Sequence, residues 1–240
     1  MNGLDRAILT FLNGYSRQSW TFDVIVASLE RNNLLKGGVI VAALWALWFR
    51  DGREGGSDAV RKIVLATFAG AFAALLVTQF LHWAVPFRIR PIHSPELLFH
   101  APFGVASGIL RHQTSFPSDH ATLLSALVTG IFLISRRAGT LAFLYLSVFI
   151  LLPRLYLGLH YPTDIAAGML VGGGCAALAN LPGPREAVTA PLLSLQASHA
   201  AWFYFLAFLV TYQTATLYRG TRELADVTLS VFGAIGSRLF

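Results

Sequence analysis

Long stretches without a charged residue constrain the fold of this chain more than any other feature. Six mostly apolar stretches approach the roughly 20 residues that a membrane-spanning helix requires. They cover residues 34–49, 63–87, 121–135, 138–153, 165–184 and 200–218. Only the first contains a charge, Lys36, whose long side chain can reach the membrane surface from near a helix end. The pattern predicts an all-α fold, a polytopic bundle of about six transmembrane helices.

The scarcity of charge excludes the other large classes of fold. Charged residues make up 12% of the 240 residues, whereas an average soluble protein carries about 25%. A soluble globule of this length needs more charged surface, and a disordered chain needs low hydrophobicity, whereas 55% of these residues are hydrophobic. We expect one membrane domain at 1–220 and a weakly amphipathic tail at 221–240, whose role the sequence does not indicate.

The N-terminal segment differs from the apolar stretches. Its apolar residues recur at helical spacing with Asp5, Arg6 and Asn13 elsewhere, which predicts an amphipathic helix at the membrane interface. The apolar positions are Leu4, Ala7, Ile8, Phe11, Leu12 and Tyr15. The next segment, 19–33, leaves open whether it spans or lies at the interface. Polar linkers with turn residues are expected at 51–58, 136–137 and 181–185.

Alternation of the spans across the membrane brings distant residues to one face. The loop that follows the span at 63–87 and the loop near 154–164 lie on the same side if each span crosses once. The linker at 136–137 lies on the other side. One face therefore gathers Arg88, Arg90, residues 111–120, Arg154, His160 and Asp164.

The net charge of +6 does not identify a partner by itself. The positive residues form no basic run or nucleic-acid-binding motif, so we expect membrane lipids as partners and no nucleic acid. Seven Lys and Arg residues fall on the opposite face and the remaining eleven on the site face, so the positive-inside rule does not favour an external site. The single cysteine, Cys175, excludes an internal disulfide, and no Cys/His spacing indicates a metal site.

Arginines and a helix start on the site face suit a phosphoryl group. A guanidinium offers a planar fork of donors that matches phosphate oxygens, so Arg88, Arg90 and Arg154 are candidates to hold one. Ser118 lies just before the stretch at 121–135, which predicts a helix N-terminus whose free N–H groups favour an anion. Taken singly, an arginine at the membrane interface is usually a snorkelling anchor.

Two histidines and an aspartate supply groups for nucleophilic and acid–base chemistry. His120 and His160 can act as acid and nucleophile near neutral pH. Asp164 lies four residues after His160, one helical turn, from where it can hold one imidazole N–H and leave the other nitrogen free to attack. The other histidines lack this spacing and are expected to be solvated or interfacial. They are His82, His93, His100, His112 and His199.

Together these segments resemble the type 2 phosphatidic acid phosphatase (PAP2) family. The family signature is Lys-x6-Arg-Pro, then Pro-Ser-Gly-His, then Ser-Arg-x5-His-x3-Asp. In the same order this chain has Arg90-Pro91, then Pro117-Ser118-Asp119-His120, then Arg154-x5-His160-x3-Asp164. The resemblance covers roughly residues 4–181.

The resemblance implies a metal-independent phosphatase without a cofactor. It implies that His160 attacks phosphorus to form a phosphohistidine, that Asp164 supports His160, and that His120 protonates the leaving oxygen and then activates water. The phosphoryl group would be held by Arg88, Arg90, Ser118 and Arg154.

Three departures from the signature refine this expectation. Trp83 stands where the family has its lysine, so Arg88 is the candidate for that basic group, and Pro153 replaces the serine of the third motif. Asp119 replaces the glycine of the second motif. The resulting Phe-Pro-Ser-Asp-His is similar to the branch that acts on undecaprenyl diphosphate, the polyprenyl carrier of bacterial wall synthesis. We therefore expect Asp119 as a possible substrate contact, with its role open, and a site at the external face of a bacterial inner membrane.

Other functions stay open at this point. The substrate of such a phosphatase could instead be phosphatidate, phosphatidylglycerophosphate or lipid A phosphate. A non-catalytic transporter of anionic lipids would use the same arginines but does not need the His160–Asp164 pair with a second histidine. The oligomeric state is not indicated. Gly168 and Gly172 are expected to let helices approach closely, and Phe99, Phe103 and Ile109 are candidates for an interfacial lid.

Overall fold

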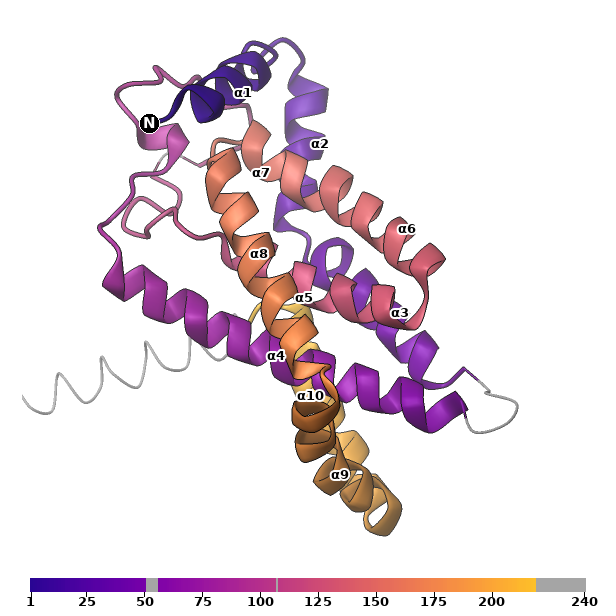
Figure 1. Ribbon diagram of the computed structural model, residues 1–240. Coiled ribbons are helices and arrows are strands. Elements are labelled where there is room, and N and C mark those ends of the chain that lie inside the picture. Colours follow the sequence, from indigo (N-terminus) through magenta and orange to yellow (C-terminus); the bar gives the residue numbers. More distant parts are fainter. Residues whose placement is uncertain (51–55, 107, 219–240) are drawn as a thin grey trace, which may run out of the picture.

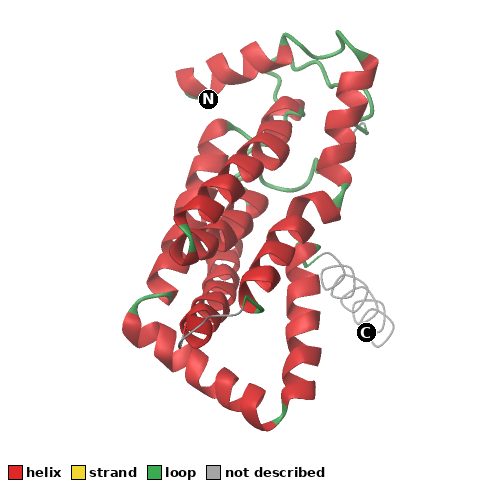
Figure 2. Cartoon of the chain, turned by 90° about the vertical axis from the view of Figure 1, so that its right-hand side faces the viewer, coloured by secondary structure: helices red, strands yellow, loops and turns green. Residues whose placement is uncertain are grey.

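Helices form all the regular structure among residues 1–50, 56–106 and 108–218, which this computed structural model describes, and no strand occurs among them (Figure 1, Figure 2). In chain order they are α1 (Gly3–Asn13), α2 (Trp20–Arg31), the π-helical η1 (Leu34–Gly38), α3 (Val39–Trp48), α4 (Gly56–Ala84), the 3-10 turn η2 (Pro91–His93), α5 (Asp119–Ile134), α6 (Arg136–Leu146), the π-helical η3 (Ser147–Leu151), α7 (Leu152–Tyr156), α8 (Pro162–Ala179), α9 (Pro182–Ser198) and α10 (Ala200–Ala215). The predicted all-α fold is confirmed. The tail predicted at 221–240 lies outside the described residues.

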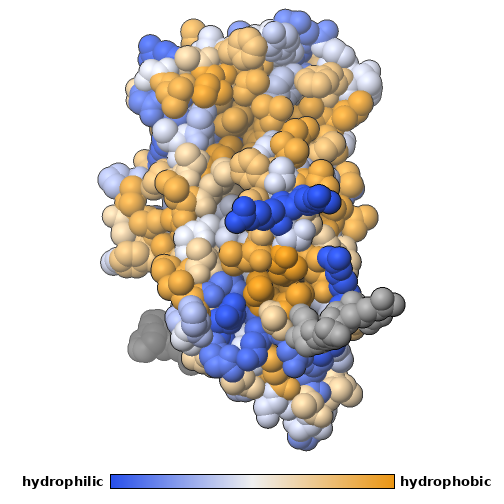
Figure 3. Space-filling view, turned by 45° about the vertical axis from the view of Figure 1, so that its right-hand side comes forward, coloured by the Kyte–Doolittle hydropathy of each residue, from blue (hydrophilic) through white to orange (hydrophobic). Residues whose placement is uncertain are grey.

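Three of the described helical stretches are long and apolar enough to cross a membrane. They are Asp58–Ala84, Arg136–Tyr156 and Pro162–Ala179, and Leu34–Trp48 and Asp119–Ile134 are shorter apolar helices. Many large apolar side chains point outward, among them Leu170, which is 78% exposed. Apolar side chains cover much of the face in Figure 3. Such a surface is suited to lipid, and the chain is an integral membrane protein.

The core forms where α4, α5 and α8 pack against one another in the middle of the molecule (Figure 1). Residues 121–128 of α5 are all buried, so this helix is enclosed by its neighbours. A Cβ added at Gly172 of α8 would lie 1.9 Å from the carbonyl oxygen of Thr122, and one added at Gly168 would lie 2.7 Å from that of Ser118. The two glycines thus let α8 touch the backbone of α5, as the sequence predicted.

The N-terminal helix lies at one end of the bundle, against α7 and α8. Leu9 faces inward, while Leu4 and Phe11 remain 62% and 65% exposed, which suits a helix at the interface. Asp5 departs from the expected polar outer face, because it is fully buried. α2 has 12 residues, fewer than the roughly 20 that spanning requires, so it does not cross a bilayer alone.

The linker expected at 181–185 is largely wrong, because Pro182 begins α9. Leu181 is the extended N-cap, and a proline in the first turn is tolerated because the N–H it lacks would have no helical partner. α9 packs against α4 and α10. Oε2 of Glu186 on α9 lies 2.7 Å from Nζ of Lys62 on α4, which makes an ion pair between the two helices. The residues expected as a linker at 136–137 likewise open a helix, α6, which Ser135 caps.

Replacing Gly172 by valine should destabilise the protein strongly, because the added side chain must displace the α5 backbone. We expect the free energy of unfolding to fall by about 3 kcal/mol, measured by thermal unfolding in detergent. The matched control is Gly174→Val, since no atom lies within 4 Å of a Cβ there. Equal effects of the two substitutions would contradict the close approach of α8 to α5.

Candidate active site

The start of α5 directs two site residues into a cavity. Ser118 is the fully buried N-cap, and its Oγ accepts from the N–H of Ala121 at 3.4 Å. Its own N–H donates to the carbonyl oxygen of Asp164 at 3.2 Å, which ties α5 to α8. Asp119 and His120 follow in the first turn and line the cavity, whereas Ser118 does not line it. The structure therefore uses Ser118 to fix the helix start.

The imidazole of His160 is held from both nitrogens in the turn between α7 and α8. Nδ1 lies 2.8 Å from the carbonyl oxygen of Ser115, and Nε2 lies 3.1 Å from Nη1 of Arg90. Because a guanidinium only donates, Nε2 is the acceptor and the proton is assigned to Nδ1. Nε2 is thus the unprotonated nitrogen of the ring, and its electron pair points toward Arg90.

Asp164 supports His160 differently from the sequence expectation. Its Oδ2 is 3.8 Å from Nδ1 of His160, beyond hydrogen-bond distance. Instead, Oδ2 accepts from Oγ of Ser115 at 2.5 Å and from the N–H of Tyr161 at 2.8 Å. The carboxylate therefore fixes the two segments that hold the imidazole, and it adds a negative charge near Nδ1.

Two of the predicted arginines line the cavity. Arg90 is 6% exposed and donates to the carbonyl oxygens of Leu159 at 2.7 Å and Thr114 at 3.1 Å. Arg154 is 2% exposed and donates from Nη2 to Oε1 of Glu30 at 2.8 Å. Among the described residues, Nε of Arg154 is a buried donor without a hydrogen-bond acceptor. A buried donor of this kind is suited to a bound anion.

Arg88 lies elsewhere, in an ion network behind the site. It donates to Oδ1 of Asp164 at 2.5 Å and to Oδ2 of Asp5 at 2.7 Å. It also donates to Oγ1 of Thr163 at 2.9 Å and stacks 4.0 Å from the ring centroid of Tyr161. Arg88 does not line the cavity that holds the two histidines. The geometry thus gives it the task of anchoring Asp164.

The cavity itself has a volume of about 400 Å³ and gathers charged and titratable groups from several helices. Those on its wall are Glu30, Arg31, Lys36, His82, Arg90, Asp119, His120, Arg154 and His160. Four of them are lysine or arginine side chains and two are carboxylates, so basic groups outnumber acidic ones on the described wall. Such a wall attracts an anion.

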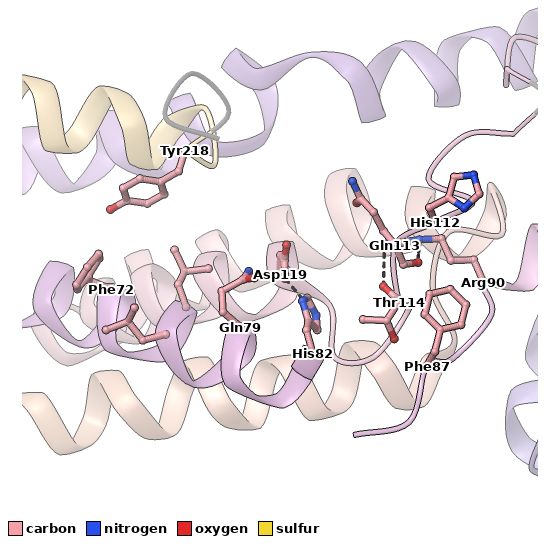
Figure 4. Close-up of a pocket in the computed structure, with 12 residues that line it drawn as sticks. Phe72, Gln79, His82, Phe87, Arg90, His112, Gln113, Thr114, Asp119 and Tyr218 are labelled. Atoms are coloured by element: carbon pink, nitrogen blue, oxygen red, sulfur yellow. Dashed lines mark hydrogen bonds and ion pairs between the residues drawn. The ribbon is translucent and has the colours of Figure 1, made fainter. Parts of the chain in front are cut away.

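A second cavity of about 600 Å³ adjoins the first and shares Arg90 and Asp119 with it. Figure 4 shows Arg90, His112 and Phe87 at one end and Phe72 of α4 with Tyr218 at the other. Space therefore continues from the charged cavity along α4 toward apolar side chains.

Sequence reasoning missed several residues at the site. Lys36 and Glu30 line the charged cavity, whereas the sequence predicts that the Lys36 side chain reaches the membrane surface. His82, expected to be solvated, lies 3.5 Å from Oδ1 of Asp119 and 3.0 Å from the carbonyl oxygen of Pro117. Asp5, expected on a polar outer face, binds Arg88. None of these residues has a sequence spacing relative to the motifs that would have revealed it.

The predicted lid residues do not act together. Phe99 packs against Gly158, because a Cβ added to Gly158 would lie 2.7 Å from the Phe99 ring. The N–H of Phe103 donates to Asp23 at 2.9 Å, which ties that residue to α2. Only Ile109 lines the charged cavity.

Comparison with known proteins agrees with this geometry. The profile of the family described as the PAP2 superfamily matches residues 60–185. No solved structure matches the chain. An integral membrane protein with a buried histidine and two buried arginines around an anion-attracting cavity is the class that the fold and the site define. Within that class, the chain belongs to the PAP2 superfamily.

Individual relatives are similar at low identity. The bacitracin transport permease protein BcrC of Bacillus licheniformis is 35% identical over 89 residues, 36% of this chain and 43% of that protein. The lipid A 4'-phosphatase of Bacteroides thetaiotaomicron is 28% identical over 182 residues, 72% of this chain and 74% of that protein. The "Putative undecaprenyl-diphosphatase YbjG" of Escherichia coli is 28% identical over 136 residues, 56% of this chain and 60% of that protein. The match thus spans less than two thirds of BcrC and of YbjG.

Loss of the Asp5 carboxylate should destabilise the end of the bundle, because Asp5 accepts from Arg88 and from Thr163 of α8. We expect Asp5→Ala to lower the free energy of unfolding by about 2–3 kcal/mol. The loss stays at this size because Arg88 keeps its bond to Asp164. The control is Asp58→Ala, whose carboxylate is 74% exposed and 3.6 Å from Arg61. It should change stability by less than about 0.5 kcal/mol. A loss as small at Asp5 would contradict the anchoring network.

Burial should keep His160 neutral well into the acidic range. Desolvation lowers its pKa from 6.5 to about 4, and the charges of Arg90 and Arg154 add to the effect while Asp164 opposes it. Nitrogen NMR of histidine-labelled protein, assigned with His160→Gln, should give a midpoint near pH 4. The exposed His199 serves as the internal reference. Between pH 6.5 and about 4 the imidazole is protonated in the unfolded chain but still neutral in the folded protein. The free energy of unfolding should therefore decrease as the pH falls through this range. A midpoint near 6.5 would contradict the burial of a neutral His160 side chain.

Proposed function

We propose that this protein is a membrane lipid-phosphate phosphatase that removes a phosphate from a polyprenyl diphosphate of the undecaprenyl type. The observation that carries the proposal is the position of His160 on the wall of a positively charged cavity that also holds His120, Arg90 and Arg154. A nucleophile, a second histidine and two guanidinium groups in one cavity are what phosphoryl transfer through a histidine requires.

In the proposed reaction, Arg90 moves its hydrogen bond from Nε2 of His160 to a phosphoryl oxygen. The freed electron pair of Nε2 then attacks the terminal phosphorus, and the bond to the leaving oxygen breaks. The imidazolium of His120 gives its proton to that oxygen. Neutral His120 then takes a proton from water, whose oxygen attacks the phosphohistidine and releases inorganic phosphate. Phosphorylation leaves a positive charge on His160, which the Ser115 carbonyl oxygen at 2.8 Å and the Asp164 carboxylate at 3.8 Å stabilise.

Arg90 and Arg154 hold the phosphoryl oxygens in this proposal. Burial and the charge of Arg154 lower the pKa of Arg90 to about 10, so Arg90 still carries its charge near neutral pH. Both guanidinium groups are fixed by protein acceptors before substrate arrives, which lowers the cost of organising the transition state. They supply the neutralisation that a metal ion gives in other phosphatases, and activity is expected without a metal.

A lipid substrate is supported by the cavity along α4. Its far wall carries Phe72, Leu75 and Leu76, which can accept an apolar chain while the phosphates reach the charged cavity. YbjG is named as a putative undecaprenyl-diphosphatase, and the second relative is named as a lipid A 4'-phosphatase. Both names describe phosphatases of lipid phosphates. Asp119 in place of the motif glycine makes the second motif resemble the branch that acts on undecaprenyl diphosphate, which supports the diphosphate as substrate. The site would then face outward from a bacterial inner membrane.

Transport is the second candidate, since BcrC is named as a transport permease. A carrier would bind the anionic head group in the same cavity and release it unchanged. Phosphate release by the purified protein separates the two functions.

The decisive test is His160→Ala in purified protein assayed for phosphate release from undecaprenyl diphosphate with EDTA present. We expect a loss on the order of 10⁴-fold or more, as for other nucleophiles. His199→Ala removes an exposed histidine and should leave the rate unchanged. Activity that survives in His160→Ala, or that requires added metal, would refute the mechanism. Wild-type protein that binds the lipid without releasing phosphate would favour transport.

A further inference from the structure

The first motif leaves the charged cavity without the basic group that the family signature places there. Trp83 occupies the lysine position, is 84% exposed and lines neither cavity. Arg88, the expected replacement, is held by Asp5 and Asp164. A cation for the His120 side of the cavity must therefore come from another element.

Lys36 meets this need from outside the stretch that matches the family profile. It is 6% exposed, lines the charged cavity, and its Nζ lies 3.5 Å from Nε2 of His120. The same nitrogen lies 3.5 Å from Oε1 of Glu30. Because an ammonium only donates, Nε2 of His120 accepts from Lys36 in this structure, and Nε2 takes up the proton of the proposed acid when the ammonium turns to a phosphate oxygen.

The charged cavity around Lys36 carries more basic groups than carboxylates, because four lysine or arginine side chains and two carboxylates line its described wall. Lys36 contacts Glu30, and Glu30 also accepts the 2.8 Å hydrogen bond from Arg154. A phosphate oxygen in this cavity would add negative charge where basic groups predominate.

The local backbone holds Lys36 in this position. It lies in the π-helical turn η1, and such turns are frequent at functional sites. A Cβ on the neighbouring Gly37 would lie 2.4 Å from the carbonyl oxygen of Ala215, so η1 packs directly on α10. The hydroxyl of Tyr145 donates to the carbonyl oxygen of Leu35, which fixes η1 from the other side.

We propose that Lys36 binds the leaving group of the substrate, the phosphate that stays on the lipid when a diphosphate is cleaved, and that Glu30 positions both Lys36 and Arg154. This inference rests on the proposed function. His120 protonates the leaving oxygen, so the neighbouring ammonium stabilises the charge of the departing lipid monophosphate. A lipid monophosphate instead leaves an uncharged alcohol, which gains little from Lys36. Lys36 therefore selects diphosphates over monophosphates.

The chain offers a matched control, because Lys36 and Lys62 are its two lysines. Lys62 also pairs with a glutamate, Glu186 at 2.7 Å, but on α4 away from both cavities. Lys36→Met, Lys36→Arg and Lys62→Met are compared in full-length purified protein with farnesyl diphosphate and farnesyl monophosphate. Lys36→Met should lower kcat/KM for the diphosphate by about 10- to 100-fold and for the monophosphate by less than about 3-fold. Lys36→Arg should restore part of the loss, and Lys62→Met should change neither value.

A binding measurement separates the failure of this inference from the failure of the proposed function. Calorimetric titration with inorganic pyrophosphate should show about 10-fold weaker binding to Lys36→Met and unchanged binding to Lys62→Met. Equal losses on both lipids, or unchanged pyrophosphate binding, would overturn the role of Lys36. Wild-type protein that hydrolyses neither lipid would overturn the proposed function, while the titration still decides whether Lys36 binds the anion. Lys36→Gln, which keeps a donor toward Glu30, replaces Lys36→Met if the latter fails to fold.

Discussion

The hydrogen-bonded ion network of Asp5, Arg88 and Asp164 is the interaction on which the site depends. Arg88 joins two fully buried carboxylates, one from the N-terminal helix and one from α8. Each carboxylate also accepts from backbone N–H groups, Asp5 from Thr163 and Asp164 from Tyr161. Removing one partner from such a network leaves a buried charge unpaired, so loss of any one member destabilises the positions of the others. The network thereby fixes the turn that carries His160.

This anchoring explains how a neutral imidazole and several cations can share a small cavity. His160 is 3% exposed and is enclosed by Ser115, Arg90 and its own turn, so water stabilises a protonated ring poorly. Asp164 lies too far from Nδ1 to accept its proton, but its charge is near enough to favour a positive charge on the ring. In the proposed reaction the same arrangement keeps the ring neutral before attack and stabilises the charge that attack would leave on it.

The sequence predicted the all-helical membrane fold and part of the group of motif residues that meet, since Arg88 and Ser118 do not line the cavity. Charge-free stretches report the bilayer directly, and alternation of spans brings Arg90, Arg154 and His160 to one end. Helical spacing cannot report what a polar residue contacts, so Asp5 looked solvent-facing although α7 and α8 cover it. A lone lysine in an apolar stretch is typical of snorkelling, and only the packing of η1 on α10 reveals Lys36 as a cavity residue. The prolines of α9 resembled a linker because a helix start and a turn share the same residues.

A division of labour follows from where these residues lie in the chain. His160 and His120, the proposed nucleophile and acid, and the two cavity arginines fall within residues 60–185, the stretch that matches the family profile. Asp5, Glu30 and Lys36 lie before it, on α1, α2 and η1. Phosphoryl transfer, the proposed reaction, tolerates little displacement, and His120 and Asp164 lie on the closely packed helices α5 and α8, with His160 in the turn before α8. Recognition of the leaving group, as proposed, needs only a charge at the wall of the cavity, and Lys36 of η1 can supply it. Under this proposal substrate preference can change through Lys36, whereas Asp5 of α1 is tied to Arg88 and Asp164 and thus to the support of His160.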